Sequence, residues 1–371
     1  MIFQSTDNTR IGKPVGTTIC LCMIVKDESR VIQRCLASVK PLIDNWLIVD
    51  TGSTDDTVEV IRKVMSPLPG RIEERPWVDF GHNRSEAMAL AQEMSDFTLT
   101  IDADEILLLD DDFAWPDFLN DIYAIKTRLG PLVFARGYLM RSTLGWRYEG
   151  VIHERPACDS ATSINWLEKA TVFSLGDGGR SQITDRNEQE VRDLKAALAK
   201  NPQNDRYRFL LANALTNTSK LHEALEVYEQ CLKIDKTPYH RWYATYQIAL
   251  VNERLGGQNA EIVGQYQKAF ELDPRRAEPL YRLVRLHRLA GEFGVARQLA
   301  EVALTIEKPE VFEPVDHELY DILLPAEYAI CCQQLGDRQT ATTIYNKLLK
   351  KPGLTAQVKV MLENNKRLAS T

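Results

Sequence analysis

Three short apolar runs, each ending directly in a cluster of polar and acidic residues, constrain the fold of this chain most strongly. Each run is rich in β-branched residues, as buried strands are. Stretches with helical spacing of apolar residues lie between them. Strands are expected at 19–25, 46–49 and 97–101, and helices at 29–40, 54–65 and 84–94. Strands that alternate with helices predict an α/β fold with a parallel sheet and crossover helices.

The polar motifs fall where these strands end, at residues 26–28, 50–55 and 102–105. Open α/β sheets bind their ligands beyond the carboxyl ends of the strands. We therefore expect a functional site at this edge of the sheet. Residues 107–118 are expected to form a loop or short helix, with further strands near 132–135 and 138–140.

The chain changes character after about residue 187, where it becomes almost wholly helical and repetitive. An alanine and an aromatic residue recur at similar spacing, as in Ala224–Tyr228 and Ala341–Tyr345. The period is near the roughly 34 residues of tetratricopeptide units, which this region resembles. We expect three parts: a loose arm at 1–16, an α/β domain at 17–186 and an all-α repeat domain at 187–371.

Composition excludes several classes of protein. The 371 residues carry a formal net charge of −7, which disfavours general nucleic-acid binding. No apolar run approaches the roughly 20 residues that span a bilayer, and the N-terminus lacks the order of a signal peptide. The seven cysteines form no paired zinc-type array. These features favour a cytoplasmic protein.

Asp102-Ala103-Asp104 carries the clearest chemical signal, since two carboxylates in one turn suit a hard divalent cation. A Mg²⁺ or Mn²⁺ ion there could neutralise a nucleotide diphosphate leaving group. The plain alternative is a solvated acidic loop.

Four motifs in order then resemble family 2 glycosyltransferases of the GT-A fold. They are the strings at 23–28, 47–57, 83–84 and 99–105. The resemblance covers roughly residues 17 to 175. It implies a GT-A (Rossmann-like) catalytic domain that inverts the sugar's configuration and uses a nucleotide-sugar, with UDP-sugar the expected donor, and Mn²⁺ or Mg²⁺.

The resemblance also implies roles for residues at the strand ends. The nucleotide's base and ribose would lie along Val25, Lys26 and Glu28, and Asp50 would hydrogen-bond the base. Arg84 would approach the donor phosphates, unless it is a surface helix arginine. Asp55 would contact the donor or only cap a helix. Asp102 would meet the ribose or the metal through water, and Asp104 would bind the metal directly.

The string at 146–154 resembles a segment of some of these enzymes. It implies His153 as a further metal ligand, although a lone histidine is more often structural. Inversion requires a general base for the acceptor's proton, for which Glu154 is preferred over Glu149. Either glutamate could instead be an ordinary ion-pair partner. The turn at 177–180 either folds over the donor phosphates or is a plain turn.

The acceptor stays open at this point. A protein or peptide is reasonable because such repeats usually bind peptides, and a glycan is the other expectation. The repeats would bind the acceptor or form a homodimer. Two alternatives are a catalytically inactive repeat scaffold and a nucleotidyltransferase. The second would need a Gly-rich basic loop after the first strand, and residues 23–29 lack one.

Overall fold

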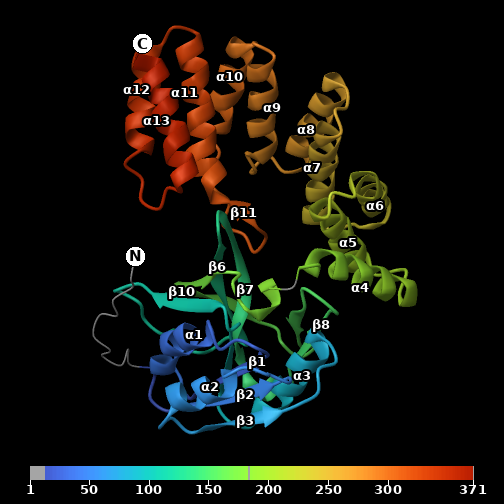
Figure 1. The fold of residues 1–371 in the computed structure, drawn as a ribbon, viewed down its shortest axis with the longest axis vertical. Coiled ribbons are helices and arrows are strands. Elements are labelled where there is room, and N and C mark those ends of the chain that lie inside the picture. Colours follow the sequence, from blue (N-terminus) through green and yellow to red (C-terminus); the bar gives the residue numbers. More distant parts are fainter. Residues whose placement is uncertain (1–12, 183, 371) are drawn as a thin grey trace. The chain divides into compact units, whose positions relative to one another are not determined.

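The computed structural model describes residues 13–182 and 184–370, which divide into two compact units between Ala197 and Leu198 (Figure 1). Most of the predicted arm at 1–16 lies outside the described residues. The predicted boundary after residue 186 differs from the division of the structure. Helix α4, Arg186–Lys200, lies mostly in the first unit, where its Glu190 forms an ion pair with Arg180.

The first unit is built on one mixed sheet whose strands follow the order β3-β2-β1-β4-β7-β6-β10-β5. Strand β1 pairs in parallel with both β2 and β4, and β2 pairs in parallel with β3. The predicted parallel α/β sheet is therefore present. Its strands are β1 (Ile19–Val25), β2 (Asn45–Asp50), β3 (Gly70–Glu74) and β4 (Phe97–Thr100).

The rest of the sheet is antiparallel at most of its junctions. Strand β7 (Leu132–Arg141) pairs antiparallel with β4 and β6 (Ile122–Leu129). Strand β10 (Ile164–Ser174) lies between β6 and β5 (Glu105–Leu109). The prediction of a loop or short helix at 107–118 was thus wrong for residues 107–109, which belong to strand β5. They form a strand because they pair with β10, some sixty residues further along the chain. A separate hairpin joins β8 (Arg147–Glu149) and β9 (Arg155–Ala157).

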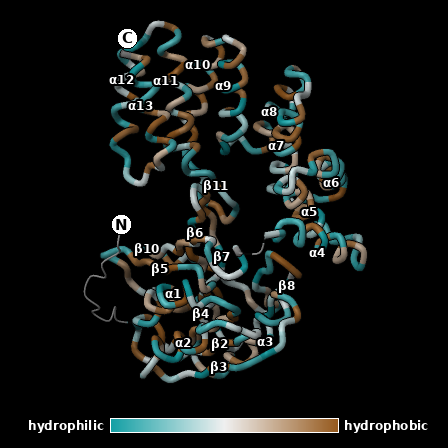
Figure 2. Tube along the Cα trace, in the orientation of Figure 1, coloured by the Kyte–Doolittle hydropathy of each residue, from teal (hydrophilic) through white to brown (hydrophobic). Residues whose placement is uncertain are grey.

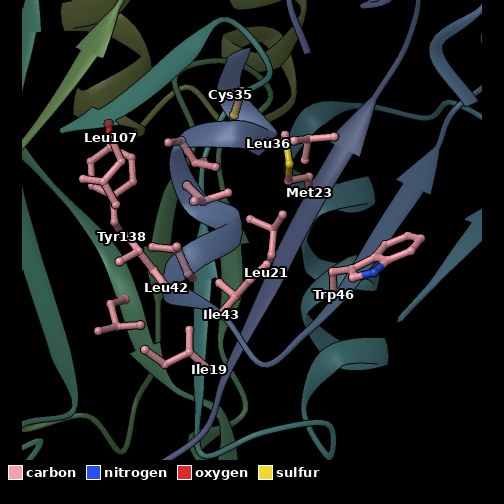
Figure 3. Close-up of a cluster of buried hydrophobic side chains, with 14 of the residues drawn as sticks. Ile19, Leu21, Met23, Cys35, Leu36, Leu42, Ile43, Trp46, Leu107 and Tyr138 are labelled. Atoms are coloured by element: carbon pink, nitrogen blue, oxygen red, sulfur yellow. The ribbon is translucent and has the colours of Figure 1, made fainter. Parts of the chain in front are cut away.

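Side chains on the two faces of β1 belong to two different hydrophobic clusters, as the alternation of a strand requires. Ile19, Leu21 and Met23 pack against Cys35 and Leu36 of helix α1 (Figure 3). Cys20 and Cys22 point to the opposite face, toward helix α3. The helices are α1 (Ile32–Val39), α2 (Thr57–Met65) and α3 (Phe80–Ala91).

The second unit consists of antiparallel helix pairs with small residues at their contacts, which allow close helix approach. Ala224, Ala249, Ala269 and Ala300 are wholly buried. Hydrophobic and hydrophilic residues alternate along these helices (Figure 2), as expected for amphipathic repeats. Its helices are α5 (Asp205–Asn217), α6 (Leu221–Ile234), α7 (Pro238–Arg254), α8 (Asn259–Leu272), α9 (Glu278–Leu289), α10 (Phe293–Ala303), α11 (Leu324–Gln334), α12 (Arg338–Leu348) and α13 (Ala356–Ser370).

Across residues 13–182 and 184–370, the helices are all too short or too polar to cross a membrane.

Candidate active site

The loops after β1 and β2 are held together by hydrogen bonds at the carboxyl edge of the sheet. The Thr54 amide donates to Asp27 Oδ1 at 2.6 Å, and the Glu28 amide donates to Thr57 Oγ1 at 2.7 Å. Asp27 adopts a left-handed backbone, with φ of 55°. The two motifs therefore form one surface, on which Lys26 is exposed. Val25 is buried under it.

Asp50 is engaged within its own loop. Its carboxylate accepts hydrogen bonds from the Gly52 amide at 3.3 Å and the Ser53 amide at 3.1 Å. Only 6% of the residue is exposed. Its position at the end of β2 matches the prediction, and its bonds fix the shape of the turn.

Asp102, Ala103 and Asp104 form a tight turn between β4 and β5. The Glu105 amide donates to the Asp102 carbonyl at 3.0 Å, and the Asp102 amide donates to Glu105 Oε2 at 3.1 Å. These bonds fix the backbone of the turn that carries the two aspartates.

Arg84 joins Asp102 to Glu154, although these residues come from three separate segments. Its guanidinium forms an ion pair with Asp102, and its Nε donates to Glu154 Oε1 at 2.6 Å. Burial alone would lower the pKa of Arg84, but the carboxylates of Asp102 and Glu154 raise it above its ordinary value. The arginine therefore stays charged and organises both carboxylates.

Arg136 on β7 was not predicted and approaches Asp102 from another side. Its Nη1 lies 3.5 Å from Asp102 Oδ2, and its Nη2 donates to Glu105 Oε1 at 2.6 Å. Burial would raise the pKa of Asp102, but Arg84 and then Arg136 lower it to about 2. Asp102 is thus ionised and held by two arginines.

Glu28 and Asp104 lie together on the other side of the turn, against the backbone of Gly178 and Gly179. The Gly179 amide donates to Glu28 Oε2 at 2.9 Å. A Cβ on Gly178 would lie 3.0 Å from Glu28 Oε2 and 3.2 Å from the Asp104 Cβ, so only glycine leaves this space open. Burial raises the pKa of Glu28 to about 7, with Asp104 adding to the effect. Burial and then Asp102 also raise the pKa of Asp104.

These two carboxylates fit a divalent cation. Both have a raised pKa, so a nearby positive charge would stabilise their ionised forms. No group of three potential metal-ligating side chains is found within the described ranges. Mg²⁺ is commonly held by one or two carboxylates together with substrate phosphates, and the pair matches this arrangement.

The remaining predicted residues lie apart from this pair. His153 Nε2 lies 3.7 Å from Glu190 Oε2, and its side chain is 50% exposed. The structure thus brings His153 next to Glu190 of α4, a neighbour that was not predicted. Glu149 lies on the β8–β9 hairpin, where it pairs with Arg147 at 2.9 Å and is 45% exposed. Glu154 is only 12% exposed.

Loop 176–180, with the turn at 177–180, lies against Glu28 and Asp104, and whether the turn folds over donor phosphates stays a prediction. Asp177 forms an ion pair with Arg34 of α1. Burial lowers the pKa of Arg180 and is the largest cause of its shift. A signal in the sequence for this loop was its three glycines, which permit the close backbone contact at Glu28.

Residues 20–123 match the model of glycosyl transferase family 2, and residues 205–238 match a tetratricopeptide repeat. The first unit contains a family 2 glycosyltransferase domain. The predicted enzyme class, glycosyltransferase, is confirmed, as is the combination with repeats.

Three relatives show how far this glycosyltransferase resembles known proteins. A TPR repeat-containing protein of Synechococcus elongatus is 28% identical over 77% of this chain and 75% of its own length. An uncharacterized glycosyltransferase of Rickettsia conorii is 35% identical over 26% of this chain and 32% of its own. The glycosyltransferase SunS of Bacillus subtilis is 24% identical over 56% of this chain. The match covers 52% of SunS, so the chain spans only part of the two relatives named as glycosyltransferases.

Proposed function

We propose that this protein transfers a sugar from a nucleotide-sugar, with UDP as the expected nucleotide, to an acceptor with inversion and with a divalent ion. The observation that supports it most is the convergence of Glu28, Asp102, Asp104, Arg84 and Glu154 at the carboxyl edge of a family 2 domain. The loops after β1 and β2 lie at the same edge, where Lys26 is exposed to a nucleotide. Val25 and Asp50 are buried there and would shape the loops that receive it.

Asp104 and Glu28 would hold the Mn²⁺ or Mg²⁺ ion. When bound, such an ion neutralises charge on the leaving diphosphate. Arg84 keeps Asp102 and Glu154 oriented, and its positive charge lies beside the Asp102–Asp104 turn, where the leaving diphosphate would be.

Glu154 is the proposed general base that accepts the proton of the acceptor. It lies inside the site, where its carboxylate is held by Arg84, whereas Glu149 is on the exposed hairpin. The repeat unit is proposed to bind the acceptor, which would be a glycan or a protein, or to form a homodimer.

The test is calorimetric titration with UDP, GDP, ADP and CDP, each with Mn²⁺ and with a chelator. We expect one nucleotide to bind in a metal-dependent manner. Asp104→Asn should abolish that binding while keeping the fold, because it removes a charged ligand without changing size. Asp111→Asn, an exposed change on the same stretch of chain, is the matched control. Metal-dependent binding that survives unchanged in Asp104→Asn would refute the metal site, and no nucleotide binding at all would refute the donor site.

A further inference from the structure

Residues 75–79, between β3 and α3, expose apolar side chains that the proposed transfer chemistry does not use. Trp77 is 42% exposed and Val78 is 55% exposed. Both belong to the glycosyltransferase unit and follow directly from the carboxyl end of β3. The exposed part of the Trp77 ring would gain free energy if a ligand covered it, because burial of apolar surface is favourable.

This segment is held in place by Asn83, which is wholly buried. The Asn83 side-chain amide donates to the Pro76 carbonyl at 3.0 Å, and its side-chain oxygen accepts from the Val78 amide at 2.9 Å. These two bonds fix the backbone on both sides of Trp77. The indole is thus presented from a rigid segment, which lowers the entropy lost when it binds a ligand.

Trp77 packs edge to face against the part-buried ring of Phe80. Their ring centroids are 4.7 Å apart with planes at 80°. The guanidinium of Arg180 lies over the Phe80 ring at 4.7 Å. We call Trp77, Val78, Phe80 and Arg180 the aromatic platform.

The platform adjoins the proposed base. Phe80 and Arg84 are four residues apart on α3 and so share one face of the helix. Arg84 donates to Glu154 at 2.6 Å. The same helix end packs closely on the backbone of the β8–β9 region, since a Cβ on Gly81 would lie 2.7 Å from the Gly150 carbonyl oxygen.

Polar groups border the platform on the side of Arg180. Arg180 Nη2 donates to Glu190 Oε1 at 3.2 Å, and His153 Nε2 lies 3.7 Å from Glu190 Oε2. Arginine, glutamate and histidine together supply donors and acceptors for hydroxyl groups. His153 therefore has a place in the molecule that does not require it to bind a metal.

We propose that the aromatic platform binds a sugar ring of a glycan acceptor, so that one of its hydroxyls faces Glu154. A pyranose ring has one apolar face of C–H bonds and a rim of hydroxyls, which matches aromatic walls bordered by Arg180, Glu190 and His153. The charges of this border are mixed, which suits a neutral ligand better than a charged one. This inference rests on the proposed function.

The test is saturation-transfer NMR on the full chain without donor. The probes are the methyl glycosides of glucose, galactose, mannose, N-acetylglucosamine and rhamnose, together with a set of neutral tripeptides. We expect saturation of the ring C–H protons of at least one glycoside. Trp77→Ala and Phe80→Ala should each weaken its binding at least about tenfold. Trp166→Ala, which removes a half-exposed tryptophan on β10, should leave it unchanged.

Three outcomes would overturn the proposal. They are no signal from any glycoside, equal signals in wild type and Trp77→Ala, and signals from the tripeptides alone, which would indicate a protein acceptor. A parallel UDP titration with Mn²⁺ distinguishes the failures. Absent UDP binding in the wild type defeats the proposed function, whereas loss of UDP binding in Trp77→Ala with glycoside binding intact would assign Trp77 to the donor's base.

Discussion

Replacing Arg84 by methionine should destabilise the first unit substantially, because one arginine neutralises two carboxylates. Glu154 is 12% exposed and has Arg84 as its ion-pair partner. Asp102 is 31% exposed and keeps Arg136 at 3.5 Å. The main loss is therefore the ion pair of Glu154, which would keep a longer-range attraction to Arg180.

The expected loss of unfolding free energy follows from how Arg84 is shared between Glu154 and Asp102. Breaking a buried ion pair by removing one partner costs about 3–5 kcal/mol. The partial exposure of Asp102 and its second arginine place Arg84→Met near the low end, at about 3 kcal/mol. Glu154→Gln alone should cost about 1 kcal/mol, because a glutamine oxygen still accepts a hydrogen bond from Arg84.

Amide hydrogen exchange measured by mass spectrometry suits this test because it reports each unit separately. A loss of about 3 kcal/mol corresponds to roughly 100-fold faster exchange in the most protected amides of residues 80–91 and 97–109. Peptides of residues 205–303 should be unchanged. Arg71→Met, which breaks a solvent-exposed pair with Glu73, is the control and should leave the exchange rates nearly unchanged.

The double variant Arg84→Met/Glu154→Gln carries the decisive comparison. Since it removes the charge that has lost its ion pair, it should be more stable than Arg84→Met alone by about 1 kcal/mol or more. Simple addition of the two single effects, or wild-type protection in Arg84→Met, would refute the account of this pair.

Three further predictions concern the site and the repeats. Gly178→Ala should weaken metal-dependent nucleotide binding at least about tenfold, because the new methyl group lies 3.0 Å from Glu28 Oε2. Gly294→Ala, with open space around it, is the control in the same calorimetric titration. Equal nucleotide affinities in the two variants would argue against the Glu28–Asp104 pair. Glu154→Gln should lower kcat about 100-fold or more while Glu149→Gln changes it less than about twofold, and the reverse order in a transfer assay would exchange the two assignments. Burial raises the pKa of Glu278 above 4.5, so its contribution to the stability of the repeat unit is full below that pH and is lost as the pH rises through the raised value. Thermal unfolding at pH 4.5 and 8 should show that Glu278→Gln gains stability relative to wild type at the higher pH. A stability difference between variant and wild type that is the same at both pH values would count against this.

The first part of the sheet could be predicted because its signals are local. Strand β1 and residues 46–49 of β2 are continuous apolar runs, β4 alternates apolar residues with threonine, and the helices between them have clear spacing. Strand β5 was missed because Glu105 follows two aspartates and looks like part of an acidic loop. It becomes a strand only through pairing with β10, where Ser174 lies opposite Glu105. Such long-range pairing has no local pattern in the sequence.

The same limit applies to the candidate site. Asp102, Asp104, Arg84 and Glu154 were found because each lies in a recognisable motif. Arg136 was not found, since its role depends on β7 lying beside β4 across about forty residues of chain. Asn83 received no role from the sequence, and its buried side chain holds the backbone next to Trp77.

The position of the Asp102–Asp104 turn has a mechanical consequence. It joins β4 to β5, which stand four places apart in the strand order. In a flat sheet these strands would be about 19 Å apart, a span that a tight turn of four residues does not reach. The sheet must therefore curve so that the end of β4 comes close to the start of β5, and the acidic turn is the covalent connection between them. Changes in the pairing of β6 with β10 should therefore alter the position of the Asp102–Asp104 turn. Engineering of this enzyme should treat those strands as part of its active site.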